Sequence, residues 1–189
     1  LVEVSRSPQP HGLMCFWIHP GGHRLIATQI IPDAPLLPGK YTPLSKPSTV
    51  QWYAIEGNRV RHLSEVKVQP GLPTALLPPS MILRISPDGR LALICQRATD
   101  GGRDFCDVLI ADLTLKKPQI TSVIKQASDG LESFAFHPNG KMAVATGLGT
   151  DHNSVAVIDI ASKPARLLYT MDAKGIGQGI EFTPEGDML

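Results

Sequence analysis

Short apolar runs separated by polar turns follow one another along the whole chain. One turn pattern recurs four times, and in each copy an apolar residue precedes a polar residue, a proline, one variable residue and a glycine. The copies are Ile18-His19-Pro20-Gly21-Gly22, Ile85-Ser86-Pro87-Asp88-Gly89, Phe136-His137-Pro138-Asn139-Gly140 and Phe182-Thr183-Pro184-Glu185-Gly186. Proline presets φ for the second position of a turn, and glycine tolerates the left-handed conformation that closes it. Each copy therefore predicts a tight hairpin between two strands.

Two further apolar stretches follow each of the first three hairpins. The third strand of each unit is rich in β-branched residues and is expected to be buried on both faces. Third strands are predicted at 50–55, 108–113 and 155–160, and fourth strands at 60–68, 119–125 and 166–171. The spacing of Ile120, Val123, Ile124 and Ala127 also suits a short helix, so only the repeat favours a strand there.

Four antiparallel strands in a repeating unit predict the blade of a β-propeller. The intervals between the last three turns are close to the roughly 40–50 residues typical of such blades. We predict an all-β protein with blades at about 10–69, 78–127 and 131–174, part-blades at 1–5 and 178–189, and a Pro-rich insertion at 32–49. Three blades do not close a ring, so residues 1–189 are expected to be one partial propeller, a segment of a larger ring.

Charge and composition narrow the partners. The 18 Lys and Arg nearly balance the 17 Asp and Glu, which leaves a net charge of +1 and no electrostatic signature of nucleic-acid binding. No apolar run reaches the roughly 18 residues that span a bilayer, and no signal peptide is visible. The 17 Gly and 17 Pro exclude a long helical bundle. We predict a protein or small-molecule partner, besides the remaining blades of the same propeller, and no cofactor or metal.

Three stretches resemble a known repeat family. Residues 175–186, with the sequence Gly-Ile-Gly-Gln-Gly-Ile-Glu-Phe-Thr-Pro-Glu-Gly, resemble the loop and inner strand of YVTN-type propeller repeats. Residues 136–145 resemble the equivalent strand pair of the lactonase-like branch, and residues 154–159 resemble its third strand. The YVTN tetrad itself is replaced by Ala-Val-Ala-Thr at 143–146. The first blade departs further, because it has Gly21-Gly22 and the long insertion.

This resemblance implies a seven-bladed propeller that is usually extracytoplasmic, either periplasmic or secreted. Members of the family include lactone hydrolases, cofactor-bearing redox subunits and binding modules. The repeat residues belong to the fold, so they transfer no catalytic role. We predict a non-catalytic module that binds a protein or a small ligand. The alternatives are a lactonase-like hydrolase with its site at the central channel, and a propeller subunit of a redox enzyme.

The loops that join the second strand to the third, and one blade to the next, vary far more than the Pro-containing turns. Variable loops on a rigid frame usually carry function, so the face bearing them is predicted to bind the ligand. The candidate ligand-binding residues are His11, Arg97, Arg103, Asp104, Glu132, Asp151, His152 and Gln178. Arginine suits a carboxylate or phosphate, and His152 suits a general base. In the insertion, Asp33, Lys40 and Tyr41 are candidates for contact with a protein partner.

Gln96–Phe105 is predicted as the loop after the second strand of the second blade. The sequence allows two alternative positions for the turn within it. A turn at Asp100-Gly101 places Arg97 opposite Asp104 and Cys95 opposite Cys106, where a disulfide is workable. A turn at Gly101-Gly102 separates both pairs and favours buried thiols. The third cysteine is Cys15, and an odd count of three indicates no disulfide framework.

Overall fold

The structure is a computed structural model that describes residues 13–30, 48–68, 83–100, 103–128, 131–147, 155–172 and 180–187. All regular secondary structure in these ranges is β-strand. Within them, no helix has the length and apolar character of a bilayer-spanning segment.

Twelve described strands form three antiparallel four-stranded sheets. Sheet one has the order β1-β2-β3-β4, sheet two the order β5-β6-β7-β8, and sheet three the order β9-β10-β11-β12. The strands are β1 Leu13–Ile18, β2 Arg24–Ile30, β3 Ser48–Glu56, β4 Arg59–Val68, β5 Leu83–Ile85, β6 Leu91–Asp100, β7 Arg103–Asp112, β8 Gln119–Ser128, β9 Leu131–Phe136, β10 Met142–Gly147, β11 Val155–Asp159 and β12 Arg166–Met171. The predicted all-β fold class is therefore confirmed, and 119–125 lies in a strand rather than a helix.

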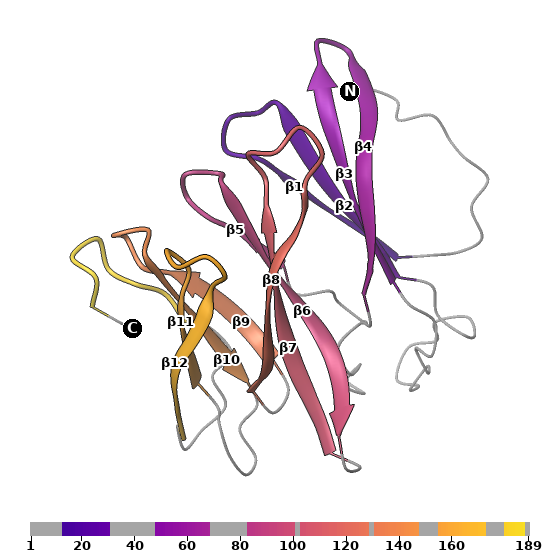
Figure 1. The fold of residues 1–189 in the computed structure, drawn as a ribbon. Helices are drawn as coiled ribbons and strands as arrows, with labels where there is room; N and C mark the ends of the chain where they lie inside the picture. The colour runs from indigo at the N-terminus through magenta and orange to yellow at the C-terminus, as the bar shows by residue number, and fades with distance from the viewer. Residues whose placement is uncertain are drawn as a thin grey trace.

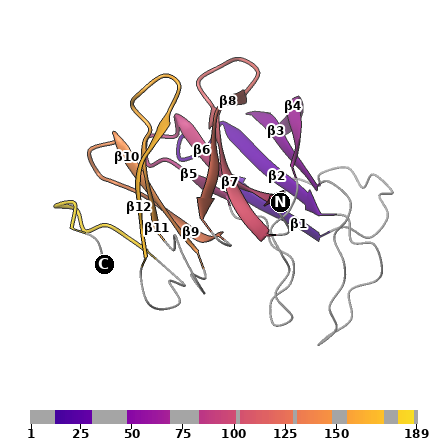
Figure 2. The same ribbon diagram turned by 60° about the horizontal axis from the view of Figure 1, so that its bottom comes forward.

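The three sheets lie side by side in chain order (Figures 1 and 2). Alternate residues of sheet two face opposite neighbours, because side chains alternate along a strand. In β6, Ile94 belongs to the core shared with sheet one, whereas Leu93 and Cys95 belong to the core shared with sheet three. This alternation explains why β7 is buried on both faces between Cys106 and Ala111, as the sequence predicts.

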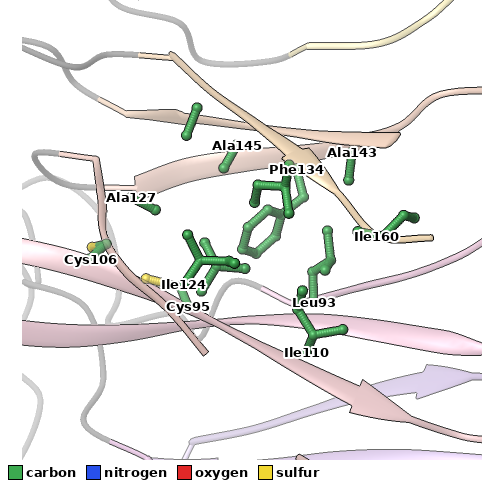
Figure 3. Close-up of a cluster of buried hydrophobic side chains, with 13 residues drawn as sticks. Leu93, Cys95, Cys106, Ile110, Ile124, Ala127, Phe134, Ala143, Ala145 and Ile160 are labelled. Carbon is green, nitrogen blue, oxygen red and sulfur yellow. The ribbon is translucent and has the colours of Figure 1, made fainter. Parts of the chain in front are cut away.

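The core between sheets two and three gathers around one aromatic side chain. Phe134 of β9 is only 1% exposed, and Figure 3 shows it directed toward Leu93, Ile110 and Ile124 of sheet two. The other members of this core are Cys95, Cys106, Val108, Ala127, Ala143, Ala145, Ala156, Ile158 and Ile160. Large side chains come mainly from sheet two and small ones from β10, so the two faces interdigitate.

The four Pro-containing turns share one geometry. In each, the amide of the glycine donates to the carbonyl of the residue before proline, over 2.7–3.0 Å. The glycines have positive φ: 69° at Gly22, 71° at Gly89, 67° at Gly140 and 97° at Gly186. The turn geometry is therefore confirmed in all four copies, and the hairpin is confirmed in the first three, where β1–β2, β5–β6 and β9–β10 pair.

The second sheet departs from the prediction between Gln96 and Phe105. This segment is not a loop, because β6 and β7 stay paired as far as Asp100 and Arg103. Gly101-Gly102 is the sequence between the two paired strands. The long ribbon extends past the ends of β5 and β8 (Figure 1).

The register of this ribbon corrects the alternative that had a turn at Asp100-Gly101. Cys95 lies opposite Val108, and Arg97 lies opposite Cys106 rather than Asp104. Cys95 and Cys106 are both thiols in the core between sheets two and three. They occupy diagonal positions, so the directly opposed pair that the predicted disulfide needed does not form.

Candidate functional site

Most residues that the sequence nominates for binding lie outside the described residues. These are His11, Asp33, Lys40, Tyr41, Asp151, His152 and Gln178. Four others are described by their backbone only: Arg97 on β6, Arg103 and Asp104 on β7, and Glu132 on β9. The structure brings the first three onto one hairpin and places Glu132 on the neighbouring sheet. Their roles in binding stay predictions.

The hairpin that carries Arg97, Arg103 and Asp104 is a two-stranded ribbon at its end. Strand β5 pairs with β6 only at Ala92–Ile94, and β8 pairs with β7 only as far as Cys106. Among the described residues, 98–100 and 103–105 therefore pair with each other alone. The ribbon lies at the end of sheet two opposite to the Pro-containing turns.

A second candidate site lies among those turns, at the boundary between sheets two and three. It is a cleft of about 500 Å³, a size typical of small-ligand pockets. Its lining residues are Ser86, Pro87, Asp88, Arg90, Leu91, Asp112, Thr114, Phe136, His137, Pro138, Asn139, Gly140, Ile160, Ala161 and Lys163. The lining includes two aspartates, one arginine and one lysine, so the cleft has no strong net charge.

The turn at Ser86 organises one wall of the cleft. The Ser86 hydroxyl donates to Asp88 Oδ1 over 2.6 Å, and the amide of Arg90 donates to the same oxygen over 3.0 Å. Burial raises the pKa of the Asp88 carboxyl, but these hydrogen bonds and the positive charge of Arg90 outweigh it. The pKa of Asp88 therefore lies below its usual value of 3.8.

Asp88→Asn is expected to flatten the acid dependence of stability. A lowered pKa in the folded state means that ionised Asp88 stabilises the fold above pH 3.8, and that this contribution is lost as the pH falls through the folded-state pKa. Urea unfolding between about pH 5 and pH 2 should show a shallower slope in the variant. Some slope should remain, because hydrogen bonds from Ser162 lower the pKa of Asp159. Glu185→Gln, at an exposed position, is the control; equal slopes in the two variants would refute the role of Asp88.

Two histidines bridge neighbouring turns on the same face. His19 Nδ1 accepts from the Gly21 amide over 2.9 Å, so Nε2 carries the proton and donates to Gly89 O over 2.7 Å. The His137 ring lies over Gly186, and a Cβ built on that glycine would lie 2.6 Å from His137 Nε2. Each histidine thus reaches from the turn of one sheet to the glycine of the next turn. The equivalent residue of sheet two is Ser86, and the cleft lies there.

Asp107 is a buried charge that the sequence analysis did not single out. The residue is 1% exposed in the middle of β7. Its carboxylate accepts from Lys125 Nζ over 2.7 Å and from the amide of Gln126 over 2.9 Å. Gln126 has a φ of 48°, and the register shifts between Cys106 and Val108. Asp107 therefore fixes a bulge between β7 and β8, and an acidic residue inside an apolar run was the available signal.

Asp107→Ala is expected to lower the free energy of unfolding by about 1–3 kcal/mol, because it removes the charged acceptor of the hydrogen bonds from Lys125 Nζ and from the Gln126 amide. Asp107→Asn keeps an oxygen for the Gln126 amide and should lose less. Chemical denaturation of both variants measures the difference. Equal losses would show that the bulge does not depend on this hydrogen bond.

No protein-family model matches the sequence, and no curated protein matches it. Solved structures do match the coordinates. A functionally unknown protein from Desulfotomaculum acetoxidans DSM 771 has a TM-score of 0.56 at 16% identity, over 92% of this chain and 47% of its own. Kuenenia stuttgartiensis hydrazine synthase has a TM-score of 0.56 at 13% identity, over 89% and 52%. Pseudomonas aeruginosa periplasmic gluconolactonase has a TM-score of 0.55 at 16% identity, over 90% and 48%.

The fold is that of a β-propeller segment. Identities of 13–16% show the fold and nothing about the reaction. The chain spans about half the length of each matched structure, with 47–52% of those chains covered.

Proposed function

We propose that this chain is part of a non-catalytic β-propeller that binds a partner protein through the end of the β6–β7 ribbon. The observation that supports the proposal is the ribbon itself, in which 98–100 and 103–105 pair with no third strand among the described residues. Such edges present backbone donors and acceptors to which another chain can add a strand. Propeller blades otherwise leave only short edges.

The sequence of the ribbon suits a polar partner surface. Arg97, Asp100, Arg103 and Asp104 place both signs of charge along it. Mixed charges guide orientation and exclude wrong partners more than they add affinity. The proposed contact thus combines backbone pairing with a charge pattern.

Site-specific cross-linking tests the proposal. A photoreactive phenylalanine analogue at Thr99, on the ribbon, is expected to give one discrete cross-linked product in the cells that make the protein. The same analogue at Asn58, in the turn between β3 and β4, is the control and should not give that product. Absence of a Thr99 product, or an identical product from Asn58, would contradict the proposal.

A variant with a shortened hairpin is a second test of the proposed partner contact. Deleting 98–100 and 103–105 leaves Arg97 and Cys106 opposite each other across Gly101-Gly102, so the register of the buried part is kept. The variant should retain the thermal unfolding of the parent and lose the partner. Retention of the partner would place the contact elsewhere.

Lactone hydrolysis distinguishes the enzymatic alternative. Pseudomonas aeruginosa periplasmic gluconolactonase shares the fold, so gluconolactone is the substrate to assay. Under the binding proposal, Arg97→Ala and His152→Ala leave any hydrolysis by the protein unchanged. A large loss of turnover in either variant, at unchanged melting temperature, would favour a lactonase-like site instead.

We propose further that the three sheets are consecutive blades, with bounds near 10–69, 78–127 and 131–174, in an extracytoplasmic ring of seven. The packing of Ile180 against the outer face of sheet three supports continuation of the repeat. Half-length coverage of the matched structures supports further blades. The extracytoplasmic location is supported by the similarity of the fold to that of a periplasmic gluconolactonase.

A further inference from the structure

We propose that the cleft between sheets two and three binds a peptide segment carrying a histidine and an arginine side chain. The ligand would supply an imidazole and a guanidinium between sheets two and three. Sheet one supplies the same two groups between sheets one and two. This site lies on the turn face, at the opposite end of sheet two from the ribbon, and is independent of the partner contact proposed above.

The boundary between sheets one and two shows what a filled cleft looks like. The His19 imidazole is 9% exposed and donates through Nε2 to Gly89 O. Arg24, the first residue after the same turn, extends its guanidinium to the carbonyl oxygens of Leu113 and Leu115, the latter over 3.0 Å from Nη2. One imidazole and one guanidinium from sheet one thus close the gap to sheet two.

Both groups are missing at the next boundary. Aligning the Pro-containing turns places Ser86 at the position of His19 and Leu91 at the position of Arg24. The Ser86 hydroxyl stays within its own turn, where it bonds Asp88 Oδ1 and accepts from the Leu91 amide over 2.9 Å. The Ser86 hydroxyl is used within its turn, and Leu91, which packs against the core between sheets two and three, has no side-chain donor for a carbonyl oxygen of sheet three.

The opposite wall of the cleft has the residues that correspond to those contacted by His19 and Arg24. Gly140 corresponds to Gly89, and among the described residues no atom lies within 4 Å of a Cβ built on it. Ile160 corresponds to Leu113, since each follows the aspartate that ends a third strand. Both Gly140 and Ile160 line the cleft, together with Ser86 and Leu91.

Size and charge favour a peptide over an isolated ring. A volume of about 500 Å³ exceeds what one imidazole occupies and falls in the range of pockets that hold drug-sized ligands, which leaves room for an imidazole and a guanidinium on one short segment. Asp88 and Asp112 offset Arg90 and Lys163 in the lining, so the cleft lacks the positive field that a phosphate or nucleotide site needs.

Fragment binding to the purified protein, followed through amide resonances, tests the two halves of the site separately. Imidazole is expected to shift the Gly140 amide saturably, and methylguanidine the Ile160 and Ala161 amides, each with a Kd on the order of 1 mM. Ser86→His should weaken imidazole binding at least about tenfold and spare methylguanidine. Leu91→Arg should do the reverse. Ser86→Thr is the matched control, because Thr183 occupies that position in the fourth turn, and it should bind both fragments normally.

A peptide arm tests the class of ligand. Peptides in which histidine and arginine are separated by one to three glycines should, at the best spacing, bind at least about tenfold tighter than either fragment. The shortened β6–β7 hairpin should bind them equally well, which separates this site from the proposed partner contact. Failure of every peptide to exceed the fragments would overturn the peptide assignment.

The reverse substitution keeps the proposal open to refutation if Ser86→His does not fold. His19→Ser is expected to open the boundary between sheets one and two and to create an imidazole site with Gly89 O as the acceptor. The proposal would be overturned if the His19→Ser variant did not bind imidazole. It would also be overturned if imidazole left the Gly140 and Ser86 resonances of the parent protein unchanged, or if a peptide with alanine in place of histidine bound equally well.

Discussion

Phe134→Ala is expected to lower the free energy of unfolding by about 3–5 kcal/mol. Phe134 lies 1% exposed between sheets two and three, where its ring contacts a core built from both sheets. Alanine removes the apolar contacts of the ring and leaves a cavity that two sheets cannot easily collapse. Urea or guanidinium unfolding followed by circular dichroism measures the loss.

Phe134→Leu is the matched control for this prediction. Leucine keeps most of the buried volume, so the loss should stay below about 1.5 kcal/mol. If Phe134→Ala and Phe134→Leu were equally mild, the ring would not occupy the space between the two sheets, and the order of the layers would need revision.

Gly89→Ala is expected to destabilise the protein more than Gly140→Ala, although both glycines have a positive φ near 70° (71° and 67°). The left-handed backbone alone costs an alanine about 1–2 kcal/mol at either position. At Gly89 the new methyl group also overlaps the His19 ring, which adds about 1–3 kcal/mol for overpacking and displaces the hydrogen bond to Gly89 O. Thermal and chemical unfolding of both variants gives the comparison.

A double variant isolates the cause. In a His19→Ser background the overlap is gone, so adding Gly89→Ala should cost no more than Gly140→Ala does in the parent protein. An undiminished penalty in that background would show that the His19 ring is not what fills the space beside Gly89.

The sequence predicts the strands and turns well because their determinants are local. Proline and glycine at fixed offsets specify a hairpin turn wherever they occur, and apolar runs on both sides specify the paired strands. The sequence predicts a loop at Gln96–Phe105, because charged residues crowd this stretch. The strands continue there through backbone pairing as far as Asp100 and Arg103, which polarity alone does not encode.

The cleft was missed for a different reason. The Pro-containing turns are uniform in their proline and glycine, so the sequence favours the variable loop face as the binding site. The informative positions are the residue before proline and the first residue after the turn. Ser86 and Leu91 break the pattern that His19 and Arg24 set, but only coordinates show that those two side chains bridge to the next sheet.

Methyl nuclear Overhauser contacts from β6 test the central claim, that three four-stranded sheets lie face to face in chain order. Leu93 methyl groups should contact Ala143, Ala145 and Ile158 of sheet three, which share its core. Ile94 methyl groups should contact Ile26 and Val50 of sheet one. Contacts from Leu93 and Ile94 to the same sheet, or none from Leu93 to sheet three, would contradict the account.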